Sequence, residues 1–152
     1  MLLREIMAQF DGETVEKRTR ILLVDDHPLV RIGVRLFLAQ QPRYEVAGEA
    51  ADAVEAMRKA GELHPDLVLV DIKMPGLDGF ALARWLEEKQ PKARVVMLSS
   101  NRDAKSVVQA IEVGARGYVR KDGTMADLLL ALERVRAGLT YYPAGCTCLG
   151  PN

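Results

Sequence analysis

The sequence lacks a long hydrophobic run, since no apolar stretch approaches the roughly 20 residues that a membrane-spanning helix needs. Arg4 and Glu5 interrupt the apolar residues at its start, so that segment also lacks the continuous hydrophobic region of a signal peptide. These two absences predict a cytoplasmic protein that has no membrane partner.

Cysteine is scarce, and neither sign of charge is in excess. A disulfide between Cys146 and Cys148 would be strained and would stabilise little, and the pair offers only two metal ligands. Lys and Arg together number 21, as do Asp and Glu, so the formal charge is zero. A protein built mainly to bind nucleic acid needs a basic surplus, and this class is therefore disfavoured.

The chain has what a single globular domain requires. Of its 152 residues, 49% are hydrophobic and 28% are charged, which is typical of a folded protein rather than a disordered one. This length can bury a substantial core but leaves little room for a second domain. There is no internal repeat and no low-complexity tract.

Five short apolar runs are typical of strands that are buried on both faces of a parallel sheet. They are Ile21–Val24, Glu45–Gly48, Leu67–Val70, Val95–Leu98 and Tyr118–Val119.

Apolar residues at helical spacing follow each run. Pro28 suits the first turn of the first helix. We expect the second helix to be capped by Asp52 and to end at Gly61. The third contains Phe80, Ala83 and Leu86, the fourth ends at Gly114, and the fifth runs from a Thr124 cap along Met125, Leu128, Leu132, Val135 and Leu139.

Alternation of strands and helices over residues 20–138 predicts an α/β domain, in which an open, doubly wound parallel sheet has helices on both faces. Residues 1–19 are expected to be a short amphipathic extension, and residues 139–152 an irregular tail.

Polar side chains follow four of the five strands. Asp25 and Asp26 follow the first, Asp71 the third, Ser99 the fourth and Lys121 the fifth. Ligands of open α/β sheets bind beyond the carboxyl ends of the strands, so these groups are expected to converge. Three carboxylates repel one another, and a divalent cation together with the lysine would offset their charge. Mg²⁺ fits because it prefers oxygen ligands.

This set of residues, with Met74-Pro75-Gly76 and Gly114-Ala115-Arg116-Gly117-Tyr118, strongly resembles the receiver domain of two-component response regulators. Val24-Asp25-Asp26-His27-Pro28 and Lys121-Asp122 are similar to the NarL/FixJ branch. The resemblance covers residues 20 to about 138. It implies a flavodoxin-like fold with strand order 2-1-3-4-5.

The resemblance also implies a role for each site residue. Asp71 corresponds to the phosphoacceptor, whose carboxylate attacks a phosphoryl group. Asp26, Asp71 and the backbone carbonyl of Lys73 would bind Mg²⁺, and Asp25 would act mainly through a metal-bound water. Lys121 would pair with Asp71 before the reaction and with the phosphoryl group afterwards.

Ser99 and Tyr118 correspond to the switch residues of that family. The Ser99 hydroxyl would donate to a phosphoryl oxygen, and the Tyr118 ring would turn inward as Ser99 moves. This movement would reshape the face formed by the fourth helix, the fifth strand and the fifth helix. The resemblance implies that Lys73 and Asn101 occupy positions that, in that family, tune how a water reaches the phosphoryl group and thereby the lifetime of the active form. His27 is expected at a helix start rather than as a catalytic base.

Other functions remain open. A Mg²⁺-dependent phosphohydrolase with an aspartate nucleophile commonly carries a second carboxylate two residues later, where this sequence has Lys73. A flavodoxin-like cofactor carrier needs a phosphate-binding loop after the first strand, and Asp25 and Asp26 would repel that phosphate. A receiver that acts by contact alone, without accepting phosphate, is the remaining alternative. Under the preferred interpretation the protein is not an enzyme, and it promotes only its own phosphorylation and dephosphorylation.

The implied partner is a sensor histidine kinase or a phosphotransfer protein. Leu128, Leu129 and Leu130 cannot all face one side of a helix, so one of them is expected to be available to a partner, including a second copy of the chain. NarL/FixJ-like regulators usually continue into a DNA-binding domain, for which flanks of 19 and 14 residues are too short. We therefore expect a stand-alone receiver or a piece of a longer regulator, without nucleic-acid contact of its own.

Overall fold

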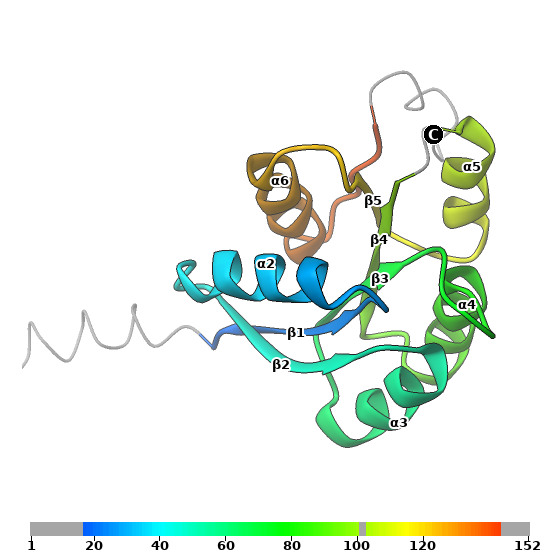
Figure 1. Cartoon of the computed structure of the whole chain (residues 1–152), viewed down its shortest axis with the longest axis horizontal. Coiled ribbons are helices and arrows are strands. Elements are labelled where there is room, and N and C mark those ends of the chain that lie inside the picture. Colours follow the sequence, from blue (N-terminus) through cyan, green and yellow to red (C-terminus); the bar gives the residue numbers. More distant parts are fainter. Residues whose placement is uncertain (1–16, 101–102, 144–152) are drawn as a thin grey trace, which may run out of the picture.

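The computed structural model describes residues 17–100 and 103–143, which build a parallel sheet between two layers of helices (Figure 1). The strand order is β2-β1-β3-β4-β5, and every neighbouring pair is parallel. The predicted flavodoxin-like topology is therefore confirmed. The strands are β1 Thr19–Val24, β2 Tyr44–Ala50, β3 Leu67–Asp71, β4 Arg94–Ser99 and β5 Gly117–Arg120; the helices are α2 Pro28–Ala39, α3 Ala53–Leu63, α4 Gly79–Lys89, α5 Ala104–Glu112 and α6 Met125–Arg136.

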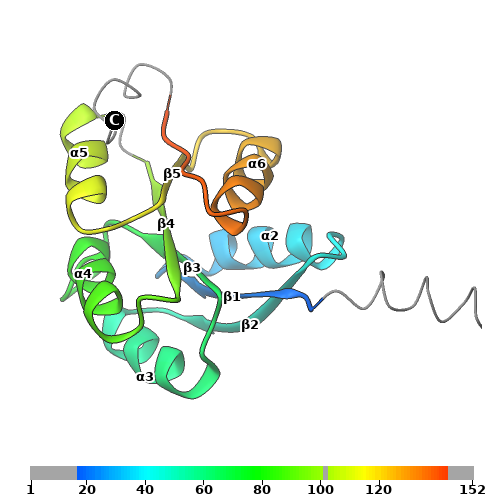
Figure 2. The ribbon, with the colours of Figure 1, turned by 180° about the vertical axis from the view of Figure 1, so that it is seen from behind.

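The sheet separates two hydrophobic clusters. Helices α2 and α6 cover one face, and α3, α4 and α5 cover the other, as the front and back views agree (Figures 1 and 2). Successive residues of β1 alternate between the clusters: Leu22 and Val24 belong to one, and Ile21 and Leu23 to the other. This arrangement explains why the strands read as continuous apolar runs.

Local signals in the sequence account for most helix starts. Pro28 occupies the first turn of α2, and the Asp52 side chain caps α3 by accepting from the backbone N–H of Glu55. Thr124 and Asp127 form a reciprocal capping box at the start of α6. These three predictions are confirmed.

Two predicted helix ends are wrong. Helix α3 continues through Gly61 to Leu63, because Leu63 packs against the core and Pro65 disfavours helical backbone only from His64 onward. His64 then adopts a left-handed conformation with φ of 48°. At the other end of the chain, Leu139 lies beyond α6, because Gly138 turns the backbone with φ of 88°.

Residues 139–143 return alongside the edge strand β5. Tyr141 forms a parallel bridge with Gly117, its N–H donates to the Arg116 carbonyl at 3.0 Å, and its carbonyl accepts from the Tyr118 N–H at 2.8 Å. The contact partly covers one edge of the sheet, where unpaired backbone groups would otherwise be open. The division into residues 1–19, 20–138 and 139–152 stays a prediction.

The register of the central strands determines what meets at their carboxyl ends. Val24 of β1 pairs with Val70 of β3, so Asp25 and Asp71 follow side by side. Ser99 of β4 pairs with Arg120 of β5, the residue before Lys121. Within the described residues, no helix is both long and apolar enough to span a membrane.

Candidate functional site

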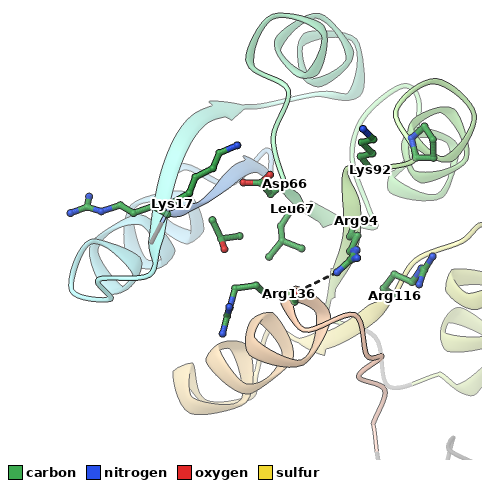
Figure 3. A pocket seen from close by; sticks show the side chains of 10 residues that line it. Lys17, Asp66, Leu67, Lys92, Arg94, Arg116 and Arg136 are labelled. Carbon is green, nitrogen blue, oxygen red and sulfur yellow. Dashed lines mark hydrogen bonds between the residues drawn. The ribbon is translucent and has the colours of Figure 1, made fainter. Parts of the chain in front are cut away.

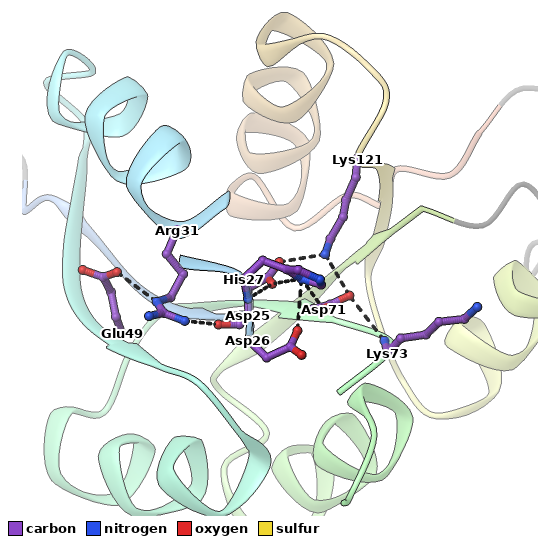
Figure 4. A network of polar contacts seen from close by, with 8 residues as sticks. All are labelled: Asp25, Asp26, His27, Arg31, Glu49, Asp71, Lys73 and Lys121. Atoms are coloured by element: carbon purple, nitrogen blue, oxygen red, sulfur yellow. Dashed lines mark hydrogen bonds and ion pairs between the residues drawn. The ribbon is translucent and has the colours of Figure 1, made fainter. Parts of the chain in front are cut away.

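A hollow of about 690 Å³ opens at the carboxyl ends of β1 and β3 (Figure 4). We call it the acidic hollow. The structure brings all three predicted aspartates and Lys121 together here. Asp25 is fully buried next to these residues, 2.9 Å from the Lys121 ammonium. The lining residues include Asp26, His27, Asp71, Lys73, Asp78, Ser100 and Lys121.

One lysine is shared between two buried carboxylates. The Lys121 ammonium nitrogen lies 2.9 Å from Oδ2 of Asp25 and 3.2 Å from Oδ1 of Asp71. Asp71 exposes only 3% of its surface. A single positive charge therefore compensates two negative charges that are largely removed from water.

This imbalance shifts the ionisation of both groups. Burial, followed by the neighbouring charge of Asp25, raises the pKa of Asp71 to about 6, although Lys121 acts in the opposite direction. Burial alone would lower the pKa of Lys121, but its hydrogen bond to Asp25 and the charge of Asp71 outweigh burial and raise that pKa. Lys121 is thus held in its charged form.

The carboxylate oxygens fit a hard divalent cation. Oδ1 of Asp26 and Oδ2 of Asp71 are buried and have no hydrogen-bond partner in the described part of the chain. Buried carboxylate oxygens without partners are costly, and Mg²⁺ binds such oxygens while keeping several waters. The Lys73 N–H donates to Oδ1 of Asp71 at 3.3 Å, and its side chain is exposed. This acidic cluster is typical of the Mg²⁺ site of receiver domains.

His27 contributes more than its position in the sequence suggested. It is the N-cap residue of α2, as expected for a helix start, but its side chain makes no capping hydrogen bond. Its Nδ1 atom instead lies 2.9 Å from Oδ1 of Asp25 and 3.1 Å from Oδ1 of Asp26. The only sequence signal was its place directly after two aspartates.

Arg31 and Glu49 hold the backbone beside the aspartates, and no sequence pattern indicated either residue. The Arg31 guanidinium donates to the backbone carbonyl of Asp25, while its Nε atom lies 3.4 Å from a carboxylate oxygen of Glu49 (Figure 4). A Lys59 amine donates to the Glu49 carbonyl. The chain segment that carries Asp25 is thereby connected to α2 and β2.

The two residues predicted to switch are both buried. Ser99, at the end of β4, exposes 3% of its surface, and Tyr118 is fully buried in the cluster on the α4 and α5 side of the sheet. Asn101, Cys146 and Cys148 lie outside the described residues.

A second hollow, of about 490 Å³, lies at the amino ends of the strands (Figure 3). We call it the basic hollow, because its lining contains six cationic side chains and a single carboxylate, Asp66. Arg94 donates to the carbonyls of Val135 at 2.8 Å and Arg136 at 3.3 Å, which satisfies the end of α6. The cations are Lys17, Arg18, Lys92, Arg94, Arg116 and Arg136.

The comparisons with known proteins agree with this geometry. A family model described as the response regulator receiver domain matches residues 21–133. NarL of Escherichia coli K12, a nitrate/nitrite response regulator, is 41% identical over 118 residues, which are 78% of this chain and 55% of that protein. This chain thus spans about half the length of the curated relatives it matches.

Two solved structures are similar throughout the fold. A LuxR-family response regulator from Aurantimonas superposes with a TM-score of 0.82 at 36% identity, covering 87% of this chain and 94% of that chain. The receiver domain of the NarL regulator of Mycobacterium tuberculosis gives a TM-score of 0.76 at 33% identity, covering 80% and 98% respectively.

The doubly wound sheet and the acidic cluster at its carboxyl edge define a receiver of the two-component class. The chain belongs to the response regulator receiver domain family. Within that family it is part of the NarL/FixJ branch.

Proposed function

We propose that the chain accepts a phosphoryl group on Asp71 from a histidine kinase or a phosphotransfer protein. The observation that carries this proposal is the buried Asp71 carboxylate, which lies 3.2 Å from Lys121 and leaves Oδ2 without a hydrogen-bond partner among the described residues. Receiver domains are typically not enzymes in their own right, and they act in the cytoplasm, where we place this chain.

In the proposed reaction, a carboxylate oxygen of Asp71 attacks phosphorus and forms an acyl phosphate. The bond between phosphorus and the donor nitrogen breaks, and the donor imidazole leaves with that electron pair. Lys121 remains paired with Asp25 and stabilises the negative charge on the transferred group. Asp26, Asp71 and the Lys73 carbonyl would hold Mg²⁺, with Asp25 acting through a metal-bound water, and the bound ion would supply further charge neutralisation.

Ser99 and Tyr118 are proposed to transmit the change. The Ser99 hydroxyl lies at the carboxyl end of β4, one strand from Asp71, and moves to donate to a phosphoryl oxygen. Tyr118 is fully buried here, so an outward position of its ring is the alternative conformation that a switch requires. The face formed by α5, β5 and α6 then differs between the two states.

An exposed leucine supports a partner surface on α6. Leu128 is buried, Leu129 is half-buried and Leu130 is 51% exposed, which is the distribution expected of three consecutive helical residues. We include self-association through this helix in the proposal. A mass that stays monomeric in light scattering, with and without beryllofluoride, would count against it.

Incubation with Mg²⁺ and acetyl phosphate or phosphoramidate, followed by intact-mass measurement, tests the phosphoryl-transfer step. We expect the mass of one phosphoryl group to be added to the wild-type chain, not to Asp71→Asn, and less to Asp26→Ala. Asp78→Asn is the matched control, because Asp78 also lines the acidic hollow but caps α4, a task that asparagine performs equally well.

Two results would change the conclusion. Absence of an adduct on the wild-type protein would leave a receiver that works by contact alone. Rapid multiple turnover of small phosphate esters would favour the phosphohydrolase alternative.

A further inference from the structure

The His27 imidazole lies against the aspartates and makes no capping hydrogen bond to α2. Its Nδ1 atom lies within reach of three carboxylate oxygens: 2.9 Å from Asp25, 3.1 Å from Asp26 and 3.8 Å from Oδ2 of Asp71. Its side chain is 60% exposed, so an ion can approach it from solvent. Asp25 and Asp71, in contrast, are almost fully buried.

The spacing of these donor atoms suits a single ion. With metal–ligand distances of about 2.1 Å, neighbouring ligands lie about 3.0 Å apart in an octahedron and about 3.4 Å apart in a tetrahedron. The separation from His27 to Asp26, 3.1 Å, lies within this range, whereas the separation from His27 to Asp71, 3.8 Å, is longer and would have to shorten on binding. One ligand atom each from Asp25, Asp26, His27 and Asp71 can be chosen so that all lie within 4.8 Å of one another.

Asp26 and Asp71, the two carboxylates that would bind such an ion, each have one buried oxygen without a hydrogen-bond donor in the described part of the chain. Oδ1 of Asp26 and Oδ2 of Asp71 are buried and accept no hydrogen bond from the described residues, and Asp71 is more than nine-tenths buried. These are also the two oxygens closest to His27 in its contacts with Asp26 and Asp71. The site therefore combines two oxygen donors with one nitrogen donor.

We propose that His27, Asp26 and Asp71 form a mixed nitrogen–oxygen site that binds a borderline transition ion, such as Co²⁺ or Zn²⁺, more tightly than Mg²⁺. Imidazole nitrogen favours such ions, whereas Mg²⁺ prefers carboxylates, carbonyls and water. Ligation uses the His27 tautomer that carries its proton on Nε2, so the hydrogen bond between Nδ1 and Asp25, which needs a proton on Nδ1, is replaced by the bond to the ion. This inference rests on the proposed function for its use of the same carboxylates. It implies that a transition ion and Mg²⁺ exclude each other from the acidic hollow.

The test is calorimetric titration of the full chain with Co²⁺ and, separately, with Mg²⁺. All proteins carry Cys146→Ser and Cys148→Ser, so that thiolates cannot compete for the metal. His27→Asn is the test variant, because asparagine is a preferred N-cap residue and should preserve α2. His64→Asn is the matched control: His64 follows α3 in a left-handed conformation that asparagine tolerates.

We expect His27→Asn to bind Co²⁺ about tenfold to a hundredfold more weakly, with Mg²⁺ affinity unchanged within about twofold. His64→Asn should bind both ions as the parent does. Equal Co²⁺ affinity in the parent and His27→Asn would overturn the inference, and so would an equal loss of affinity for both ions.

Intact-mass measurement of the Mg²⁺-dependent phosphoryl adduct on the same proteins separates this inference from the proposed function. An adduct together with unchanged Co²⁺ binding in His27→Asn overturns the His27 ligand alone. Weaker Co²⁺ binding in that variant, without an adduct on any protein, supports the ligand and overturns the phosphoacceptor.

Discussion

The Lys121 ammonium lies 3.2 Å from Oδ1 of Asp71, and the same ammonium lies 2.9 Å from the buried Asp25. The lysine is therefore divided between two carboxylates and fully neutralises neither. The folded protein holds an excess of negative charge at the carboxyl edge of the sheet. This excess lowers the stability of the folded state, and it suits a site that binds a cation and, in the function that we propose, accepts a phosphoryl group.

Replacing Asp71 with asparagine should stabilise the protein at neutral pH. The pKa of Asp71 is about 6 in the folded state against 3.8 for an ordinary aspartate carboxyl, so the unfolded chain releases this proton at lower pH. The wild-type free energy of unfolding should then fall as pH rises from about 4 to 6, and Asp71→Asn escapes that loss. Above pH 6 we expect the variant to be more stable by about 1 to 3 kcal/mol.

Urea denaturation in EDTA between about pH 4.5 and 8 measures this difference. The gap between variant and wild type should grow with pH and level off above about pH 6. Asp78→Asn, at an exposed helix cap, should show no such gain. Equal stability of Asp71→Asn and wild type at pH 8 would contradict the charge imbalance.

Magnesium should stabilise the folded chain through Asp26 and Asp71. A ligand that binds only the folded state adds about 2.7 kcal/mol when its concentration is 100 times its dissociation constant. Asp26→Asn should lose most of this increment, because it removes the charge of a half-buried carboxylate whose Oδ1 atom is buried. Asp103→Asn, the N-cap of α5, should retain it. Thermal unfolding with and without Mg²⁺ provides the measurement, and an undiminished increment in Asp26→Asn would exclude Asp26 as a ligand.

We expect any side chain at position 79, where the protein has Gly79, to clash with the backbone of β3 and the residue after it. A Cβ atom at this position would lie 2.4 Å from the backbone oxygen of Asp71 and 2.8 Å from Cα of Ile72. Gly79→Ala must therefore displace the backbone that carries Asp71, and we expect a loss of about 1 to 3 kcal/mol in unfolding free energy together with a weaker phosphoryl adduct.

Gly61→Ala is the matched control for that glycine. Gly61 lies inside α3, and an added Cβ meets nothing within 4 Å. This change should stabilise the protein by about 0.4 to 1 kcal/mol and leave phosphorylation intact. If both glycine variants behaved alike in urea denaturation and in the mass assay, the steric argument would fail.

Arg31 should tune the metal site without touching the ion. Its guanidinium joins the Asp25 carbonyl to Glu49, so Arg31→Met should free the Asp25 segment and weaken Mg²⁺ binding several-fold. Arg35→Met is the control. Arg35 also pairs with Glu49, at 2.7 Å, but within the described residues it is Arg31 that donates to the Asp25 carbonyl. Calorimetric titration of both variants and of Glu49→Gln decides the matter; equal effects of Arg31→Met and Arg35→Met would assign only a surface role to Arg31.

The sequence predicted the sheet and its carboxyl-edge cluster well because both depend on short-range patterns. Continuous apolar runs such as Leu67–Val70 can hardly be placed elsewhere than inside a parallel sheet, and Asp71 must then emerge at its carboxyl end. The sequence signal for the end of a helix is weaker than the signal for a buried strand. Gly61 did not end α3 because the packing of Leu63 outweighed the propensity of one glycine.

The contacts of His27, Arg31 and the basic hollow could not be predicted in the same way. An exposed histidine at a helix start has several rotamers, and only the assembled aspartates favour the one observed. The cations of the basic hollow extend from Lys17 to Arg136 in the sequence, so their proximity exists only after strands and helices have packed.

The basic hollow and the acidic hollow lie at opposite ends of the same strands, although the formal charge of the whole chain is zero. Such a distribution gives the described part of the chain a dipole moment along the strand direction. In the field of a charged partner the protein experiences a torque, which turns the end carrying Asp71 toward positive surfaces before contact. Its association with such a partner should slow as salt rises, in spite of a vanishing net charge.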